Sequence, residues 1–246
     1  DSFLQYLSSW ETGAEMVGIS PNGAYAYSFR TGVTSSSSGI AILSRDATTG
    51  ALTYVNTFTE DTGLPYGETH LGFNNLSSMC FSPSSDRLFI GSATYQHYSM
   101  YDNALRRPST LFVFNIDSLS GELTLSKTLL NGVDGVGGLN SDIMLSVVCS
   151  PDGSSVYTAS DASAAIVRFE TGAKDGTVSV AEQLRAGVDG ALGLSGRIGM
   201  AMTPDGQQVY AGGEDHSALV VFNRDASDGS LEWRQTIYDD DGADGL

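Results

Sequence analysis

A small set of histidine, arginine and carboxylate side chains could carry out hydrolytic chemistry. The chain contains three histidines, His70, His97 and His216. A histidine or a carboxylate can activate a water molecule as a general base, while an arginine binds an anionic substrate. No catalytic set is assigned, because polar residues are common in any solvated loop. The candidates for such a site are Glu68, His70, Arg197 and His216.

A second candidate site is a long segment, residues 94–109, that is rich in aromatic and basic residues. Long loops on a rigid scaffold often carry binding function. Aromatic rings beside hydrogen-bonding groups suit sugar or peptide surfaces. The alternative is a solvated loop that packs its own tyrosines over the fold. The candidate ligand-binding residues are Tyr95, His97, Tyr98, Tyr101, Arg106 and Arg107.

Calcium is the one cofactor that the sequence raises. Asp239, Asp240 and Asp241 concentrate carboxylate oxygens, which are the hard ligands that Ca²⁺ prefers. The run lacks the ligand spacing of an EF-hand loop, and a tight Asp-Gly turn explains similar segments elsewhere without a metal. Asn75-Leu76-Ser77 is a glycosylation sequon, usable only in a eukaryotic secretory pathway.

The charge and hydropathy of the chain limit its partners. A formal net charge of −17 repels phosphate backbones and anionic lipids, so we expect no nucleic acid or membrane partner. No stretch reaches the ~18 apolar residues of a membrane span. An acidic, lysine-poor surface suits an extracellular or cell-surface setting, although aspartates that form turns explain part of the effect.

The elements that must position these residues are repeated strands. Four copies of a Pro-centred turn lie at Ser20–Gly23, Ser82–Ser85, Ser150–Gly153 and Thr203–Gly206. Each turn is followed by short apolar or β-branched runs and a second turn that ends in glycine, as hairpin loops require. A strand-rich repeat of roughly 50–70 residues indicates a β-propeller. We therefore predict an all-β fold with about four blades of four antiparallel strands each.

The predicted blades follow one another in a single propeller segment over residues 1–246. Residues 1–13 match the fourth strand of a preceding blade, which implies a fifth blade cut from a longer array. The open ends of such an array could support self-association. The four predicted blades occupy residues 14–60, 72–131, 143–186 and 197–238, and residues 239–246 begin the next inter-blade loop.

The two cysteines fall in consecutive repeats. Cys80 lies three residues before its repeat proline, and Cys149 lies two residues before the equivalent proline. Because neighbouring strand residues point to opposite faces, the two sulfurs should point in opposite directions. We therefore expect two buried cysteines without a disulfide.

The repeats Ser150–Tyr157 and Thr203–Tyr210, together with Val221–Leu231, resemble the lactonase-type seven-bladed propellers and the related YVTN-repeat proteins. The family's enzymes open sugar or carboxymuconate lactones, while other members are surface proteins without an assigned reaction. We expect a non-catalytic structural or recognition module of a larger extracellular protein, binding protein or glycan through its loop face. The alternatives are a lactonase-like hydrolase and a calcium- or glycan-binding propeller.

Overall fold

The computed structural model describes residues 16–30, 39–59, 76–93, 109–141, 145–172, 177–187 and 193–239. These residues form sixteen strands in four antiparallel sheets, and none of them is in an α-helix. No helix that could cross a membrane is found in this described part of the chain. The predicted all-β fold of four-stranded propeller blades is confirmed. The extra N-terminal strand predicted within residues 1–13 lies outside the described residues.

Each sheet contains four strands that follow one another in the sequence. We call the sheets blades 1 to 4. Blade 1 consists of β1 (Met16–Ile19), β2 (Tyr25–Arg30), β3 (Gly39–Arg45) and β4 (Leu52–Thr59). Blade 2 consists of β5 (Leu76–Phe81), β6 (Arg87–Ser92), β7 (Thr110–Ile116) and β8 (Leu123–Leu130). Blade 3 consists of β9 (Leu145–Cys149), β10 (Ser155–Ser160), β11 (Ala165–Thr171) and β12 (Val178–Arg185). Blade 4 consists of β13 (Ile198–Met202), β14 (Gln208–Gly213), β15 (Ala218–Arg224) and β16 (Leu231–Tyr238).

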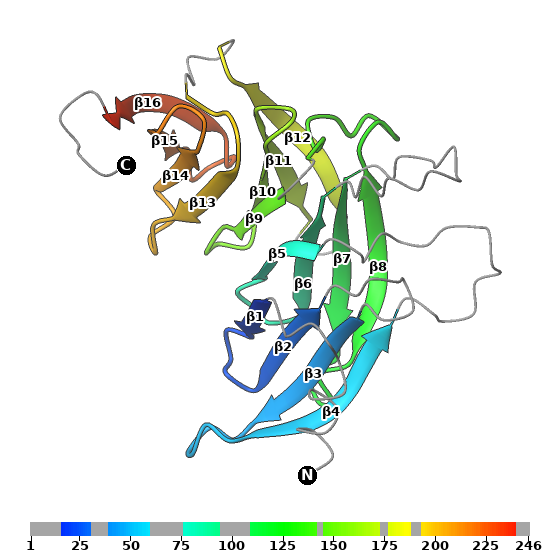
Figure 1. Ribbon diagram of the computed structural model, residues 1–246. Helices are drawn as coiled ribbons and strands as arrows, with labels where there is room; N and C mark the ends of the chain where they lie inside the picture. Colours follow the sequence, from blue (N-terminus) through cyan, green and yellow to red (C-terminus); the bar gives the residue numbers. More distant parts are fainter. Residues whose placement is uncertain are drawn as a thin grey trace.

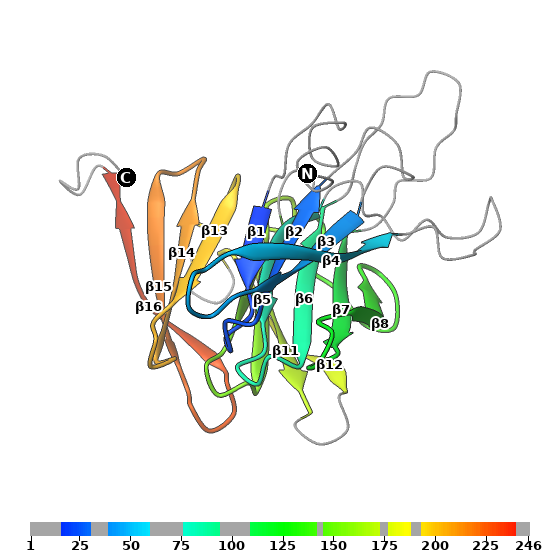
Figure 2. The same ribbon diagram turned by 90° about the horizontal axis from the view of Figure 1, so that it is seen from below.

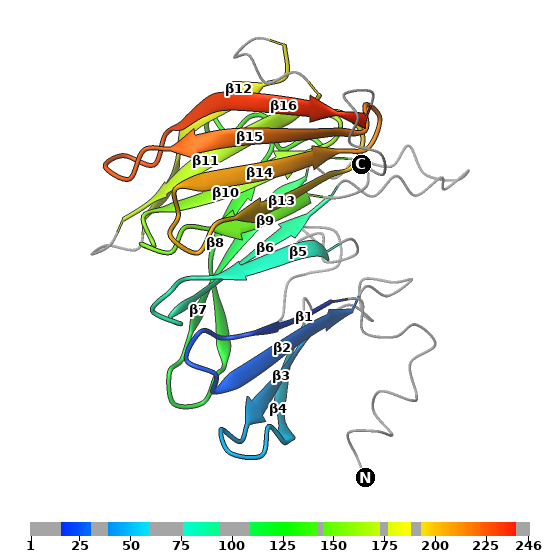
Figure 3. The ribbon, with the colours of Figure 1, turned by 90° about the vertical axis from the view of Figure 1, so that its left-hand side faces the viewer.

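The blades are arranged as an open arc (Figure 1). The first strands, β1, β5, β9 and β13, lie along its concave side, and the fourth strands lie on its outer side. In the views of Figures 2 and 3 the sheets stand one beside the next, each twisted as antiparallel sheets are. The first strand of each blade packs against the first strand of the next. Every blade is therefore positioned by its neighbours.

Three clusters of buried side chains fill the spaces between consecutive blades. Between blades 1 and 2, Tyr27 and Phe29 face Phe112 and Phe114, and each of these rings is at most 1% exposed. The second and third strands of a blade have side chains on both faces of the sheet, and both faces must be buried. The sequences of these strands are therefore nearly continuously apolar. A single blade could not cover these residues alone, which is why the repeats must stack.

The repeated turns take the conformation that their residues predict. In the third copy, Ser150 Oγ donates to Asp152 Oδ1 at 2.6 Å, and Gly153 adopts a left-handed φ of 71°. In the second copy Ser85 occupies the same position with φ of 61°, a conformation that non-glycine residues rarely adopt. The turns between the third and fourth strands of blades 1, 2 and 4 are closed by aspartates. Asp46 Oδ1, for example, accepts the N–H groups of Thr48 at 2.9 Å and Thr49 at 2.7 Å.

The prediction that the cysteines remain unpaired is wrong. Cys80 of β5 and Cys149 of β9 form a disulfide, with their Cα atoms 5.7 Å apart. The two side chains do point to opposite faces of their own blades. Because the blades are stacked, the face of blade 2 that carries Cys80 is the one that meets the face of blade 3 that carries Cys149. Opposite directions on neighbouring blades therefore bring the two sulfurs together.

Candidate functional site

On the described part of the loop face, the charged residues singled out in the sequence lie on blade 4. This face carries the connections between second and third strands and those between blades. Arg197, directly before β13, lies beside Glu214, directly after β14, with Nε 3.9 Å from Oε2. Next to this pair, Ser195 Oγ donates to Asp215 Oδ2 at 2.9 Å. Two connections that are separate in the sequence thus place a cation and two carboxylates side by side.

Backbone contacts fix the position of these groups. The N–H of Glu214 donates to the carbonyl of Arg197 at 3.2 Å, and the N–H of Asp215 donates to the carbonyl of Ser195 at 3.3 Å. The turn after β14 ends at Ser217, whose φ of 43° is left-handed. The side chains of Arg197 and Glu214 remain 58% and 59% exposed, so water has access to both.

The four candidate catalytic residues are only partly placed by the structure. Arg197 lies in the pair just described, and His216 lies exposed in the same turn as Glu214. Glu214, which is not one of the four candidates, is the residue that contacts Arg197. Glu68 and His70 lie outside the described residues. All six candidate ligand-binding residues and Asn75 also lie outside them: Tyr95, His97, Tyr98, Tyr101, Arg106 and Arg107.

The calcium candidate is described at one residue only. Asp239 follows β16, and its N–H donates to the carbonyl of Ser217 at 3.2 Å. Asp240 and Asp241 lie outside the described residues. Within the described ranges, no group of three or more histidine, cysteine, aspartate or glutamate residues is arranged to hold a metal ion.

The inter-blade loops that resemble one another in sequence are anchored by a buried leucine. Leu139 and Leu194 are at most 1% exposed. In the first of these loops, Ser160 Oγ of β10 donates to the carbonyl of Gly138 at 2.6 Å. In the second, Gly213 occupies the place of Ser160, and a Cβ there would lie 2.1 Å from the carbonyl oxygen of Gly193. Packing therefore explains the glycine and the leucine that these loops share.

The face opposite the loop face carries the Pro-centred turns. On this face a cavity of about 300 Å³ lies between blades 2 and 3. It is lined by the two Pro-centred turns and by Arg87, Cys149 and Thr171. Asp86 in its wall accepts hydrogen bonds from Ser82 at 2.7 Å and Ser84 at 2.5 Å. Arg87 Nη2 donates to the carbonyl of Gly172 at 3.3 Å. The polar groups that line this cavity are therefore engaged within the protein.

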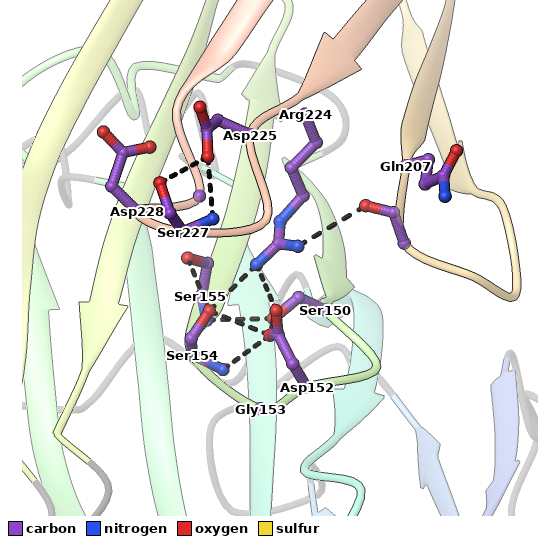
Figure 4. A network of polar contacts seen from close by, with 12 residues as sticks. Ser150, Asp152, Gly153, Ser154, Ser155, Gln207, Arg224, Asp225, Ser227 and Asp228 are labelled. Atoms are coloured by element: carbon purple, nitrogen blue, oxygen red, sulfur yellow. Dashed lines mark hydrogen bonds and ion pairs between the residues drawn. The ribbon is translucent and has the colours of Figure 1, made fainter.

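The most connected polar group on the same face is Arg224, at the end of β15. Figure 4 shows its guanidinium reaching the Pro-centred turn of blade 3. Nη2 lies 2.6 Å from Asp152 Oδ2 and donates to Ser154 Oγ at 2.9 Å. Nε donates to the hydroxyl of Tyr157 at 2.8 Å, and Nη1 donates to the carbonyl of Gly206 at 3.4 Å. The Tyr157 hydroxyl in turn donates to the carbonyl of Gly229. We call these contacts between blades 3 and 4 the arginine clamp.

Ionisation in the clamp follows from its contacts. Partial burial alone would raise the pKa of Asp152, but hydrogen bonds from Ser150, Ser154 and Arg224 hold it well below its usual value. Burial would lower the pKa of Arg224, but Asp152 and Tyr157 raise it. Burial raises the pKa of Tyr157. The clamp is therefore an ionised pair beside a neutral tyrosine.

Sequence reasoning explained the segment around Arg224 only as a turn. The signal that could have found the clamp is the recurrence of arginine at the same repeat position, since Arg45 and Arg224 both directly precede the Asp of the turn.

The sequence matches the family described as Lactonase, 7-bladed beta-propeller, over residues 108–239. This match includes blades 3 and 4, the Arg197–Glu214 pair and the arginine clamp. No curated protein matches the chain in sequence.

Solved structures with the same fold differ widely in sequence. A protein from Lactobacillus plantarum superposes with a TM-score of 0.60 at 18% identity, covering 92% of this chain and 57% of that one. A functionally unknown protein from Desulfotomaculum acetoxidans gives 0.58 at 16% identity, covering 90% and 55%. Hydrazine synthase from Kuenenia stuttgartiensis gives 0.57 at 14% identity, covering 86% and 58%. The chain thus spans little more than half the length of these proteins. At such identities the likeness shows the fold alone.

Proposed function

The chain belongs to the seven-bladed β-propeller lactonase family, and on that premise we propose that it is a lactone hydrolase. The substrate class is a sugar lactone or a carboxylated lactone. The observation that carries the proposal is the family match over residues 108–239, which includes the Arg197–Glu214 pair on the loop face. The match favours this function over the non-catalytic module that the repeat pattern alone favoured.

In the proposed reaction, Glu214 and Arg197 have complementary roles. A carboxylate can take a proton from water, and the resulting hydroxide attacks the lactone carbonyl carbon. The bond between that carbon and the ring oxygen then breaks, and the ring oxygen takes up a proton to give the open hydroxy acid. Arg197 binds the carbonyl oxygen or an anionic group of the substrate, where its charge offsets the negative charge that develops. His216, exposed in the same turn, is a second candidate for the proton transfers.

Proton release on opening of glucono-δ-lactone, followed with a pH indicator, tests the proposal. We expect the chain to accelerate ring opening above the uncatalysed rate. Glu214→Gln should lower kcat by roughly 10²–10⁴-fold, as loss of a general base does. Arg197→Gln should mainly raise KM if it binds the substrate.

Matched controls come from the exposed strand β16 on the same blade. Glu232→Gln and Arg234→Gln make the same chemical changes away from the pair and should leave the rate unchanged. No acceleration by the wild-type chain, or equal losses in the control variants, would contradict the proposed site.

A non-catalytic recognition module is the second candidate, and one observation favours it. Both members of the Arg197–Glu214 pair are more than half exposed, whereas catalytic carboxylates are commonly desolvated to tune their pKa. Binding of proteins or glycans through the loop face would need no such desolvation. A chain that binds an immobilised glycan array and opens no lactone would support this candidate over the hydrolase.

The setting in which the protein works is also proposed here. The disulfide between blades 2 and 3 supports an oxidising compartment, since disulfides persist mainly in secreted and periplasmic proteins. Together with the net charge of −17, it supports our proposal of an extracellular or cell-surface location.

A further inference from the structure

We propose that Cys149 is a site of thiol exchange, which a small uncharged or cationic thiol reaches through the cavity between blades 2 and 3 while the protein stays folded. The exchange opens the disulfide to Cys80 and makes the link between the two blades sensitive to reduction. This inference goes beyond the proposed function and concerns the face opposite the loop face. It rests on the cavity, on the disulfide beside it and on a comparison with the interface between blades 3 and 4.

The cavity gives access to one half of the disulfide. Cys149, at the end of β9, lines the cavity, whereas Cys80 is not among the lining residues that the structure describes. The side chain of Cys149 points toward blade 2, because it is bonded to Cys80 there. A volume of about 300 Å³ lies at the lower end of the range for small-molecule pockets. A low-molecular-weight thiol therefore fits.

The cavity occupies the place that an arginine fills at the next interface. Thr171 ends β11 as Arg224 ends β15. The hydroxyl of Thr171 donates to the carbonyl of Gly153 in its own blade. Arg224 Nη1 makes the equivalent bond to the carbonyl of Gly206. Because threonine is the shorter side chain, it makes this bond without filling the space toward blade 2, and it lines the cavity instead.

The positions of the two cysteines also recur at the next interface. Val148 stands at the position of Cys80, and Met202 stands at the position of Cys149. Both Val148 and Met202 pack against the buried cluster between blades 3 and 4. Equivalent positions thus carry a disulfide where the cavity is open and apolar side chains where the arginine clamp is formed.

Charge favours some thiols over others. Within the wall of the cavity, the carboxylate of Asp152 is paired with Arg224, and that of Asp86 is balanced by the guanidinium of Arg87 next to it. The charge of the whole chain then decides, and a net charge of −17 repels anions. We therefore expect uncharged and cationic thiols to react faster than anionic thiols of similar size.

The exchange has two balanced steps. The thiolate of a first small thiol bonds to Sγ of Cys149, the bond between the two cysteine sulfurs breaks, and Cys80 leaves with the electron pair and takes up a proton. The thiolate of a second small thiol then bonds to the sulfur of the first, and Cys149 leaves and takes up a proton. The two small thiols are oxidised to their disulfide, and the protein gains two thiols.

Blades 2 and 3 stay joined when the disulfide is open. Ser77 Oγ accepts the N–H of Leu145 at 2.9 Å and donates to the carbonyl of the same residue at 3.0 Å. Ser78 Oγ accepts the N–H of Val147 at 3.0 Å. The buried cluster between the two blades is independent of the bond. The reduced protein should therefore remain folded with a weaker link between these blades.

The rate of reduction by 2-mercaptoethanol tests the route, with new thiols alkylated and counted by mass spectrometry. Reduction of the folded protein should be proportional to the thiol concentration and nearly independent of urea below the unfolding transition. A route through unfolding would instead accelerate steeply with urea, because urea lowers the free energy of unfolding. The anionic thiol 3-mercaptopropionate should react more slowly, after each rate is divided by the rate with the chain unfolded in urea.

Single-cysteine variants test which sulfur is attacked. Cys80→Ser leaves Cys149 as the one thiol, and Cys149→Ser leaves Cys80. With 2,2′-dithiodipyridine, an uncharged disulfide reagent, Cys149 should react at least about tenfold faster than Cys80, since access governs exchange. A faster reaction at Cys80 would overturn the assignment.

Filling the cavity tests its role. Thr171→Arg should occupy the space as Arg224 does at the next interface and slow reduction by at least about tenfold. Thr171→Val is the matched control, because it removes the hydroxyl and leaves the cavity open. It should be reduced at the wild-type rate. Reduction of Thr171→Arg as fast as that of the wild type would contradict entry through the cavity.

Moving the disulfide provides a second comparison. In a chain with Cys80→Ala and Cys149→Ala, the changes Val148→Cys and Met202→Cys place the bond at the equivalent positions of the interface that contains the arginine clamp. This bond should resist the thiol that reduces the native one. Equal rates for the two disulfides, or a wild-type rate that rises with urea as unfolding does, would overturn the proposal.

Discussion

At the scale of single residues, Arg224 forms side-chain hydrogen bonds with four residues, more than any other residue described on the face that carries the Pro-centred turns. Its guanidinium is satisfied from two blades at once, and its side chain is only 2% exposed. A buried ion pair adds little over well-packed apolar residues, but removal of one partner leaves the other groups unsatisfied. The clamp therefore specifies how blade 4 docks on blade 3.

Arg224→Met should lower the free energy of unfolding by about 2–4 kcal/mol. The variant keeps most of the apolar volume and removes the donors to Asp152 and Tyr157. Urea unfolding followed by tryptophan fluorescence measures the loss, because Trp233 lies in blade 4. Arg224→Lys retains the charge without the Nε donor, so an intermediate loss is expected. If Arg224→Met lowered the free energy of unfolding by less than an exposed control such as Arg234→Met, this role would be contradicted.

Asp152→Asn should change how stability depends on pH. The pKa of Asp152 is lower in the folded protein than in the unfolded chain, so its stabilisation is fully present above the unfolded value of about 3.9. That stabilisation is lost as the pH falls toward the folded value. The side chain is 40% exposed, so we expect the variant to lose only about 1 kcal/mol at pH 7.

The difference between wild type and Asp152→Asn should shrink as the pH falls below about 4. Unfolding midpoints measured in urea from pH 7 to acid provide the test. A difference that stays constant over this range would show that the carboxylate charge does not matter.

The turn residues show what sequence can predict at this scale. Asp46, Asp117 and Asp225 were expected to close turns, and each accepts backbone N–H groups within its own turn. These contacts are local, so spacing alone reveals them. The role of Arg224 is not local, because its partner is 72 residues away in the sequence. Only the stacking of blades brings the two together.

At the scale of elements, the disulfide links the first strands of blades 2 and 3. The direction of each cysteine was predicted correctly from strand geometry, and the pairing was missed because each blade was considered alone. Where two blades stack, a residue that points toward the next blade meets a residue of that next blade that points back toward the first. The same argument pairs Ser78 with the backbone of Val147, whose N–H donates to Ser78 Oγ at 3.0 Å.

Replacement of both cysteines, Cys80→Ala with Cys149→Ala, should cost about 2–4 kcal/mol of stability, since the bond closes a long loop of the unfolded chain. The two positions are 69 residues apart. Thiol titration of the unfolded wild-type chain without reductant should find no reactive thiol. Two titratable thiols would show that the bond does not form, and a double variant as stable as wild type would show that it does not stabilise.

The candidate site could be predicted less fully than the strands. Arg197 was selected from the sequence as a residue that could bind an anionic substrate. Glu214 was not among the four candidate catalytic residues. A carboxylate recurs at the equivalent position of blade 3, where Asp161 is the first residue after β10, so the repeat position does not distinguish Glu214 as a site residue. Connections differ from blade to blade, so repeats carry little information about them.

At the scale of the whole molecule, stability should be distributed unevenly along the arc. In stacked repeats each unit is stabilised by its own sheet and by its interfaces with its neighbours. Blades 2 and 3 have a described neighbour on both faces and share the disulfide. Blades 1 and 4 each have one described neighbour.

Hydrogen exchange should therefore protect amides of β6, β7, β10 and β11 most strongly, and the equivalent strands of blades 1 and 4 less. Uniform protection along the arc would contradict the additive stacking of blades, because a fully cooperative molecule would open all four blades together.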